Sequence, residues 1–336
     1  MQFPQAPAAP FPWAGPRLHS RPVPVALFAL LLATAIAWVV ASVAYTAWRV
    51  VRPPRMTEGK ALYLLKRLSP EDLGLRHEPL GFDVRDGRGE QLKLVAWWIP
   101  SAAPADRTVV LLHGYGDAKI GAIAWAPTWH ELGWNVVAVD GRAHGESGGR
   151  FCSGGYHERD DLDAIVDALR ARYPTAARHV ALFGVSLGTG AAVGCAARRG
   201  DISAVVLDSP FADYGNAVRS HLRRLRVPLT TLHGVIVRLA EKICGARWRD
   251  TRPAELIRRI KCPVLTIRGS ADDFVTPGDL AALDAAMAAR DDGGRSRVVV
   301  VAGAHHTLAL AADPVRYRNV IASFLAGTRD RASAAP

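Results

Sequence analysis

Two serines in the chain stand in the G-x-S-x-G pattern that is typical of a serine nucleophile. One is Ser186 in FGVSLGTG, and the other is Ser147 in HGESGGR. A serine hydroxyl is a weak nucleophile unless a histidine accepts its proton and a carboxylate orients that histidine. Because short motifs also arise by chance, the elements around each serine must decide between them.

The elements around Ser186 favour it. The apolar run HVALFGV at 179–185 predicts a buried strand, and LGTGAAVGCAARRG after the serine predicts a helix. Ser186 therefore falls on a sharp strand-to-helix turn, where Gly184 and Gly188 leave room for a strained backbone. Ser147 is followed by the glycine-rich run GGRFCSGGY, which does not favour a helix. We predict Ser186 as the nucleophile and a loop role for Ser147.

Candidates for the acid and the base follow two later predicted strands. PVLTIRGSADDFVTP offers Asp272 and Asp273, and RVVVVAGAHHTL offers His305 and His306. Adjacent residues in an extended turn point in opposed directions, so only one histidine can serve Ser186. Asp208, at the end of VVLD, is a reserve acid or a residue that holds a neighbouring loop by hydrogen bonds. The chain order is serine, acid, histidine.

Alternating strand and helix patterns predict an α/β fold. A turn-rich run separates 80–84 from 90–100, which indicates an antiparallel hairpin. Six Val-rich runs then recur with helix-length segments between them, a pattern typical of a mostly parallel twisted sheet with helices on both faces. The runs are RTVVLLHG, NVVAVD, HVALFGV, ISAVVLD, PVLTIRG and RVVVVAG. The predicted helices are 121–132, 158–173, 187–199, 278–290 and 314–326.

With these elements in place, residues 80–328 resemble the α/β-hydrolase superfamily. The chain is most similar to its bacterial membrane-anchored group related to serine aminopeptidases and monoacylglycerol lipases. GSADDFVTP is similar to the family's acid loop in a register that selects Asp272. The family's G-x-x-H turn, counted from Gly303, selects His306 as the base, whereas its shorter G-x-H form selects His305. The resemblance thus implies a Ser186, Asp272 and His306 triad, with His305 as the alternative base.

The resemblance also implies an oxyanion hole, in which backbone N–H groups stabilise the charge of the tetrahedral intermediate. One donor is the amide of Leu187, directly after the nucleophile, and the other is the amide of Tyr115 in LLHGYGD. His113 in the same turn matches a position that shapes this loop, and Ser147 matches a structural serine of the family. We expect no metal or organic cofactor.

A long uncharged segment lies near the N-terminus. Residues 23–48 carry no charge and, at about 1.5 Å per residue, are long enough to cross a hydrocarbon layer of about 30 Å. We predict an uncleaved single-pass anchor between a Pro-rich tail at 1–22 and a basic linker at 49–78. A cleaved signal peptide and a buried core helix are the alternatives. The excess of basic residues after the segment places the catalytic domain in the cytoplasm.

Basic residues also gather in 214–262, with twelve Lys and Arg against three acidic residues. No aromatic-interleaved basic face or DNA-reading motif accompanies them, so we expect no nucleic-acid partner. The surrounding interval 211–260 lacks a strand pattern, which indicates a helical lid insertion. One helical face there roofs an acyl pocket or packs in the core. Its apolar residues are Leu229, Leu232, Ile236, Leu239 and Ile243.

The predicted domain spans 79–328, with a disordered tail at 329–336. Its four cysteines show neither zinc-site spacing nor the density of a disulfide scaffold. We interpret the chain as a serine esterase, similar to lipases, that acts on a small-molecule or lipid ester. A peptidase or a thioesterase with the same triad is the enzymatic alternative. A non-catalytic α/β-hydrolase scaffold at the membrane is the alternative from another class.

Overall fold

The computed structural model describes residues 25–85, 89, 91–226 and 230–332. The chain divides into two compact units, 1–42 and 43–336. The predicted tail at 1–22, the first two residues of the predicted anchor, Leu229 and residues 333–336 lie outside the described residues.

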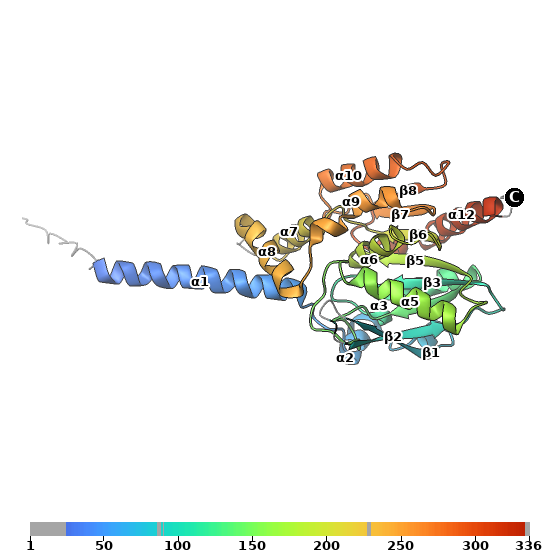
Figure 1. Cartoon of the computed structure of the whole chain (residues 1–336), viewed down its shortest axis with the longest axis horizontal. Coiled ribbons are helices and arrows are strands. Elements are labelled where there is room, and N and C mark those ends of the chain that lie inside the picture. The colour runs from blue at the N-terminus through green and yellow to red at the C-terminus, as the bar shows by residue number, and fades with distance from the viewer. Residues whose placement is uncertain (1–24, 86–88, 90, 227–229, 333–336) are drawn as a thin grey trace, which may run out of the picture. The chain divides into compact units, whose positions relative to one another are not determined.

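The second unit is built on an eight-stranded sheet (Figure 1). Its order is β1-β2-β4-β3-β5-β6-β7-β8. The strands are β1 (Glu78–Arg85), β2 (Gln91–Ile99), β3 (Arg107–Leu112), β4 (Asn135–Val139), β5 (His179–Val185), β6 (Ile202–Asp208), β7 (Val264–Gly269) and β8 (Arg297–Val301). β2 pairs antiparallel with β1 and β4, and β3 to β8 pair in parallel. The predicted hairpin and the mostly parallel sheet are confirmed.

Helices cover both faces of the sheet, as the Val-rich strands predicted. The α-helices of the unit after α1 are α2 (Glu58–Leu65), α3 (Lys119–Ala122), α4 (Ala126–Glu131), α5 (Glu158–Arg172), α6 (Leu187–Ala196), α7 (Tyr214–Arg224), α8 (His233–Cys244), α9 (Pro253–Leu256), α10 (Pro277–Ala288), α11 (Ala309–Ala312) and α12 (Pro314–Ala332). Short 3₁₀ turns lie at Pro70–Leu73, Ile123–Trp125, Thr230–Leu232, Trp248–Thr251 and Ile257–Arg259. The inner strands β3, β4, β5 and β6 are thereby shielded from water on both sides, whereas Val298 and Val300 of the edge strand β8 are 40% and 39% exposed.

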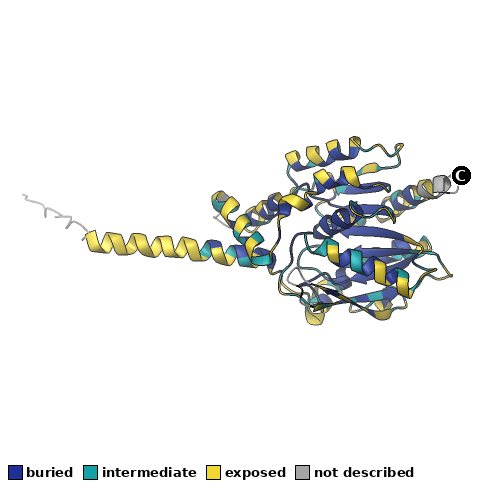
Figure 2. Ribbon diagram, viewed as in Figure 1, coloured by how far each residue is buried: buried dark blue, intermediate teal, exposed yellow. Residues whose placement is uncertain are grey.

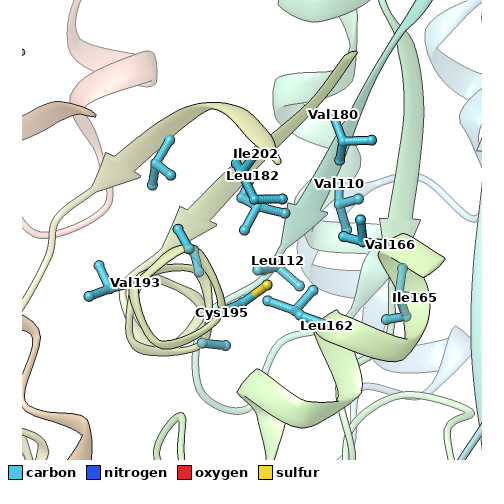
Figure 3. Packing of buried hydrophobic residues seen from close by; sticks show 14 of the residues in the cluster. Val110, Leu112, Leu162, Ile165, Val166, Val180, Leu182, Val193, Cys195 and Ile202 are labelled. Carbon is cyan, nitrogen blue, oxygen red and sulfur yellow. The ribbon is translucent and has the colours of Figure 1, made fainter. Parts of the chain in front are cut away.

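The core has one layer on each face of the sheet because successive strand residues point in opposite directions. Val110 packs in the layer formed with α5, α6 and α10, which Figure 3 shows around Leu112, Leu162 and Val193. Its neighbour Val109 packs in the other layer, against α3, α4 and α12. The two layers hold the sheet rigid, and the loops at the carboxyl ends of the strands carry the candidate site.

A third cluster joins residues of α7, α8 and the 3₁₀ turn at Trp248–Thr251 to Leu187 and to the C-terminal end of α1. Ile236 is fully buried in this cluster, and Leu232, Leu239 and Ile243 pack partly against it. The predicted apolar face of α8 is therefore present, and its described residues serve core packing.

The predicted boundaries differ from the structure at both ends. Helix α1 spans Val25–Val51, so its last three residues lie in the predicted linker, and Val50 and Val51 are buried there. At the other end α12 continues to Ala332, so the first four residues of the predicted tail at 329–336 are helical. No proline or glycine interrupts 328–332, and helix formers there extend the last turns.

Candidate active site

Ser186 lies on the sharp turn between β5 and α6. Its backbone has φ 48° and ψ −109°, a strained conformation for a residue with a side chain. A Cβ on Gly184 would lie 2.5 Å from the carbonyl oxygen of Gly188, and one on Gly188 would lie 2.5 Å from that of Leu112. The two glycines therefore have no room for side chains. This close packing holds the turn in the conformation that presents the Ser186 hydroxyl.

A chain of two hydrogen bonds joins three of the predicted residues. The Oγ of Ser186 lies 2.9 Å from Nε2 of His306, and Nδ1 of His306 lies 2.7 Å from Oδ2 of Asp272. A carboxylate only accepts, so Nδ1 carries the proton and Nε2 accepts from the serine hydroxyl. This tautomer suits proton transfer from Ser186 to His306.

The Asp272 carboxylate is 2% exposed and is held in its ionised form. Burial would raise its pKa, but the hydrogen bond and charge of His306 outweigh that effect and leave the pKa below its ordinary value. The backbone N–H groups of Phe274 and Val275 also donate to Oδ1, at 3.0 and 3.3 Å. Asp272 is thus anchored on one oxygen and faces His306 with the other.

The neighbouring residues Asp273 and His305 point elsewhere. The Asp273 side chain is 78% exposed and lies 3.5 Å from Arg224 in a surface ion pair. His305 is exposed, whereas the His306 ring packs on Phe274 with centroids 4.4 Å apart. The geometry therefore supports Asp272 and His306 in preference to their neighbours.

Asp208 holds the loop that carries His306. Its carboxylate accepts hydrogen bonds from Ser209 Oγ at 2.9 Å and Tyr317 OH at 2.7 Å. Ser209 Oγ in turn accepts from the Thr307 amide at 2.9 Å. Burial raises the pKa of Asp208, and the hydrogen bonds from Tyr317 and Ser209 oppose this rise. Asp208 thus acts on the histidine loop through Ser209. This is the second of the two roles that the sequence allowed, a residue that holds a neighbouring loop by hydrogen bonds.

The two residues predicted to donate to the oxyanion, Leu187 and Tyr115, line one pocket with Ser186. Leu187 is the first residue of α6, so its N–H has no acceptor within the helix. The loop after β3 approaches the serine closely, since a Cβ on Gly114 would lie 3.7 Å from the Ser186 Cβ. Tyr115 follows in that loop and lines the same pocket as Leu187 and Ser186. The two amides thus come from the elements that flank the nucleophile.

An apolar pocket opens at Ser186. Its lining consists of Val50, Tyr115, Ser186, Leu187, Phe211, Tyr214, Ala217, Val218, His221 and Phe274. Within the predicted lid interval 211–260, the lining comes from Phe211 and from α7. No described residue of α8 is in the lining, and Ile236 and Ala240 of that helix are buried in the cluster that also contains Tyr214 and Ala217.

A family model described as serine aminopeptidase, S33, matches residues 103–253. This match includes the strand-to-helix turn of Ser186 and the loop of Tyr115. The chain belongs to the α/β-hydrolase superfamily. It is an enzyme of the hydrolase class.

Relatives of this hydrolase cover most of its length. The uncharacterised protein YqkD of Bacillus subtilis (strain 168) is 27% identical over 287 residues, which is 80% of this chain and 91% of YqkD. An uncharacterised protein of Mycobacterium tuberculosis (strain H37Rv) is 30% identical over 231 residues, or 68% of this chain and 73% of that protein. The structure of the Pyrococcus furiosus esterase Pf2001 has a TM-score of 0.66 at 24% identity, covering 82% of the hydrolase and 97% of that chain. The similarity to the Pf2001 structure shows that the two chains share a fold.

The second serine motif of the hydrolase is used for structure. Ser147 is buried, and its Oγ donates to the Asp140 carbonyl at 2.6 Å and accepts from the Val95 amide at 2.8 Å. These bonds tie the loop after β4 to strand β2. Both partners of the hydroxyl are backbone groups, so Ser147 has no base.

Two histidines near the site also have structural surroundings. The ring of His113 donates from Nδ1 to the Gly114 carbonyl at 2.8 Å and accepts from the Gly141 amide at 2.9 Å. Burial, aided by the neighbouring His113, lowers the pKa of His144 to about 3. His144 is therefore neutral at ordinary pH, and His113 shapes the loop of Tyr115.

Several pocket residues of the hydrolase were absent from the sequence-based prediction. Phe211 and Phe274 follow predicted strands, and their position at the carboxyl ends of β6 and β7 is the signal that could have indicated them. Val50 had no such signal, because it follows Arg49 in the segment that the sequence assigned to the basic linker at 49–78. Within the described ranges, no group of three or more His, Cys, Asp or Glu side chains is placed to hold a metal ion.

Proposed function

We propose that the hydrolase cleaves carboxylic esters through Ser186, His306 and Asp272. The observation that carries the proposal is the hydrogen-bonded chain from Asp272 Oδ2 through the His306 ring to Ser186 Oγ, with bonds of 2.7 and 2.9 Å. It lies at a nucleophile turn beside an apolar pocket, which supports the binding of an acyl group.

In the proposed reaction, Ser186 Oγ bonds to the acyl carbonyl carbon while its proton passes to Nε2 of His306. The amides of Leu187 and Tyr115 stabilise the oxyanion. His306 then gives the proton to the leaving alcohol oxygen as the ester bond breaks. A water molecule repeats the sequence on the acyl-enzyme, with His306 as base, and releases the carboxylic acid. Asp272 orients the ring and stabilises the imidazolium throughout.

The pocket favours an ester over the substrate of an aminopeptidase. An aminopeptidase must bind a charged α-amino group close to the scissile bond, which calls for a carboxylate there. The described residues that line the pocket of this hydrolase include no aspartate or glutamate. An acyl chain without charge suits such a lining, because burying its apolar surface is favourable.

The purified full-length chain is expected to hydrolyse p-nitrophenyl esters and to react covalently with a fluorophosphonate probe. Both reactions require a serine activated by a base. The measurement compares p-nitrophenyl release with the hydrolysis of aminoacyl p-nitroanilides and acyl thioesters under the same conditions. Faster anilide or thioester turnover would replace the esterase proposal by a peptidase or thioesterase. A chain that neither turns over a substrate nor labels would be a scaffold.

We propose further that α1 anchors the hydrolase to a membrane, with the catalytic domain in the cytoplasm. Helix α1 has 27 residues and is long and apolar enough to span a bilayer. A signal sequence near the N-terminus would pass the same test. If mature chains retain residues 1–24, the segment is an anchor and not a cleaved signal.

The full-length chain is therefore expected to sediment with membranes and to resist extraction by alkaline carbonate. A spanning helix is released only when detergent replaces the lipid around it, whereas a peripheral protein leaves in carbonate. Immunoblots of the fractions, with N-terminal sequencing of the retained chain, provide the measurement. A soluble chain that begins after residue 24 would contradict the anchor.

A further inference from the structure

The last two turns of α1 belong to the compact unit that holds the candidate site. Helix α1 is exposed over most of its length and is buried only near its C-terminal end (Figure 2). The buried residues are Val43, Ala47, Val50 and Val51. Their spacing of three to four places them on one helical face. They pack in one cluster with residues of α7 and α8.

Within that face, Val50 reaches the pocket of Ser186. Val50 is 6% exposed and lines the pocket together with Phe274 and Ala217. It is also the one lining residue of α1 among the residues that the structure describes. One part of the pocket wall thus comes from the N-terminal helix, far from the other lining residues in the sequence.

Hydrogen bonds on both sides of Val50 fix its position. The hydroxyl of Tyr115 donates to the Arg49 carbonyl at 2.9 Å, and the amide of Cys152 donates to the Val51 carbonyl at 2.8 Å. The Val51 carbonyl lies at the helix end and has no intrahelical donor, so the Cys152 amide satisfies it, whereas the Arg49 carbonyl also accepts from the Arg52 amide at 3.2 Å. The end of α1 is therefore attached to the loop that carries Tyr115 and cannot be displaced without affecting the pocket.

We propose that Val50 is a specificity-determining residue that limits the length of the acyl chain accepted at Ser186. The inference rests on the proposed esterase function and names its substrate class, an ester with an apolar acyl chain. A larger side chain at position 50 reduces the space for the chain, and a smaller one enlarges it. Because pocket walls in proteins are close-packed, a change of a few methylene groups in the wall alters kcat/KM for substrates of different chain length.

The test measures kcat/KM of the full-length chain in detergent for p-nitrophenyl acetate, butyrate, octanoate and decanoate. We expect Val50→Phe to lower the ratio of octanoate to acetate by about tenfold or more, since one methylene in a pocket is worth about tenfold. Val50→Ala is expected to raise the ratio of decanoate to acetate. The matched control is Val40→Phe, which makes the same change on the same helix at a residue that is 63% exposed. It should leave both ratios within about twofold.

Unchanged ratios in both Val50 variants would overturn the inference, while ester turnover by the wild type would leave the proposed function intact. Absence of ester turnover and probe labelling in the wild type would instead be a failure of the proposed function. Overpacking by Val50→Phe can destabilise the fold, and circular dichroism reports whether that variant folds. If it does not, the Val50→Ala ratio alone decides, because this variant only removes atoms.

Discussion

Replacing Ser186 with alanine is expected to lower kcat for ester hydrolysis by about 10⁶-fold and to abolish fluorophosphonate labelling. Loss of a triad nucleophile removes the acyl-enzyme route altogether, and what remains comes from the oxyanion hole and substrate binding. Ser186 is the serine that stands at the strained turn and lies 2.9 Å from a histidine. Initial rates with p-nitrophenyl butyrate and gel-based probe labelling give the measurement.

Ser147→Ala is the control from the second G-x-S-x-G motif. It removes the acceptor of the Val95 amide and the donor to the Asp140 carbonyl, so we expect a loss of about 1–3 kcal/mol in the free energy of unfolding. Turnover should stay within about tenfold of the wild type, and labelling should persist. Wild-type turnover in Ser186→Ala would refute the mechanism. Loss of labelling in a folded Ser147→Ala variant would move the nucleophile to the other motif.

Replacing His306 with alanine is expected to lower kcat by about 10³-fold or more, the scale of removing a triad base. His306 connects Ser186 and Asp272 through its two ring nitrogens, so no other described side chain is placed to take the serine proton. His305→Ala should lose far less, because His305 is exposed beside the site. The measurement is kcat of both variants, with circular dichroism to confirm folding.

The adjacent histidines are a matched pair, because the two variants alter the same loop by the same atoms. If His305→Ala showed the larger loss while both variants were folded, the base would be His305 and the hydrogen bond seen for His306 would not be the productive one. Equal and small losses would argue against a histidine base altogether. Only a large loss confined to His306 agrees with the proposal.

The amino-acid sequence by itself determined the sheet, the order of its parallel strands along the chain and the turn of Ser186. These features depend on local patterns, because apolar runs specify buried strands and Gly184 and Gly188 permit the strained turn. The choice of Ser186 over Ser147 was available for the same reason. A strand that leads directly into a helix can be recognised from the pattern of about twenty consecutive residues.

The tertiary structure decided which side chains converge. Ser186 and His306 are 120 positions apart, and their contact depends on where β5 and β8 place their loops in one sheet. Sequence spacing left His305 and His306 as alternatives, because a one-residue step reverses the direction of a side chain and only the packed loop sets which one faces inward. Val50 is the clearest case. Residues 25–48 of α1 carry no charged side chain, so the sequence does not reveal which face of the helix is buried. The place of Val50 in the pocket wall arises only when the end of α1 packs against α7 and the loop of Tyr115.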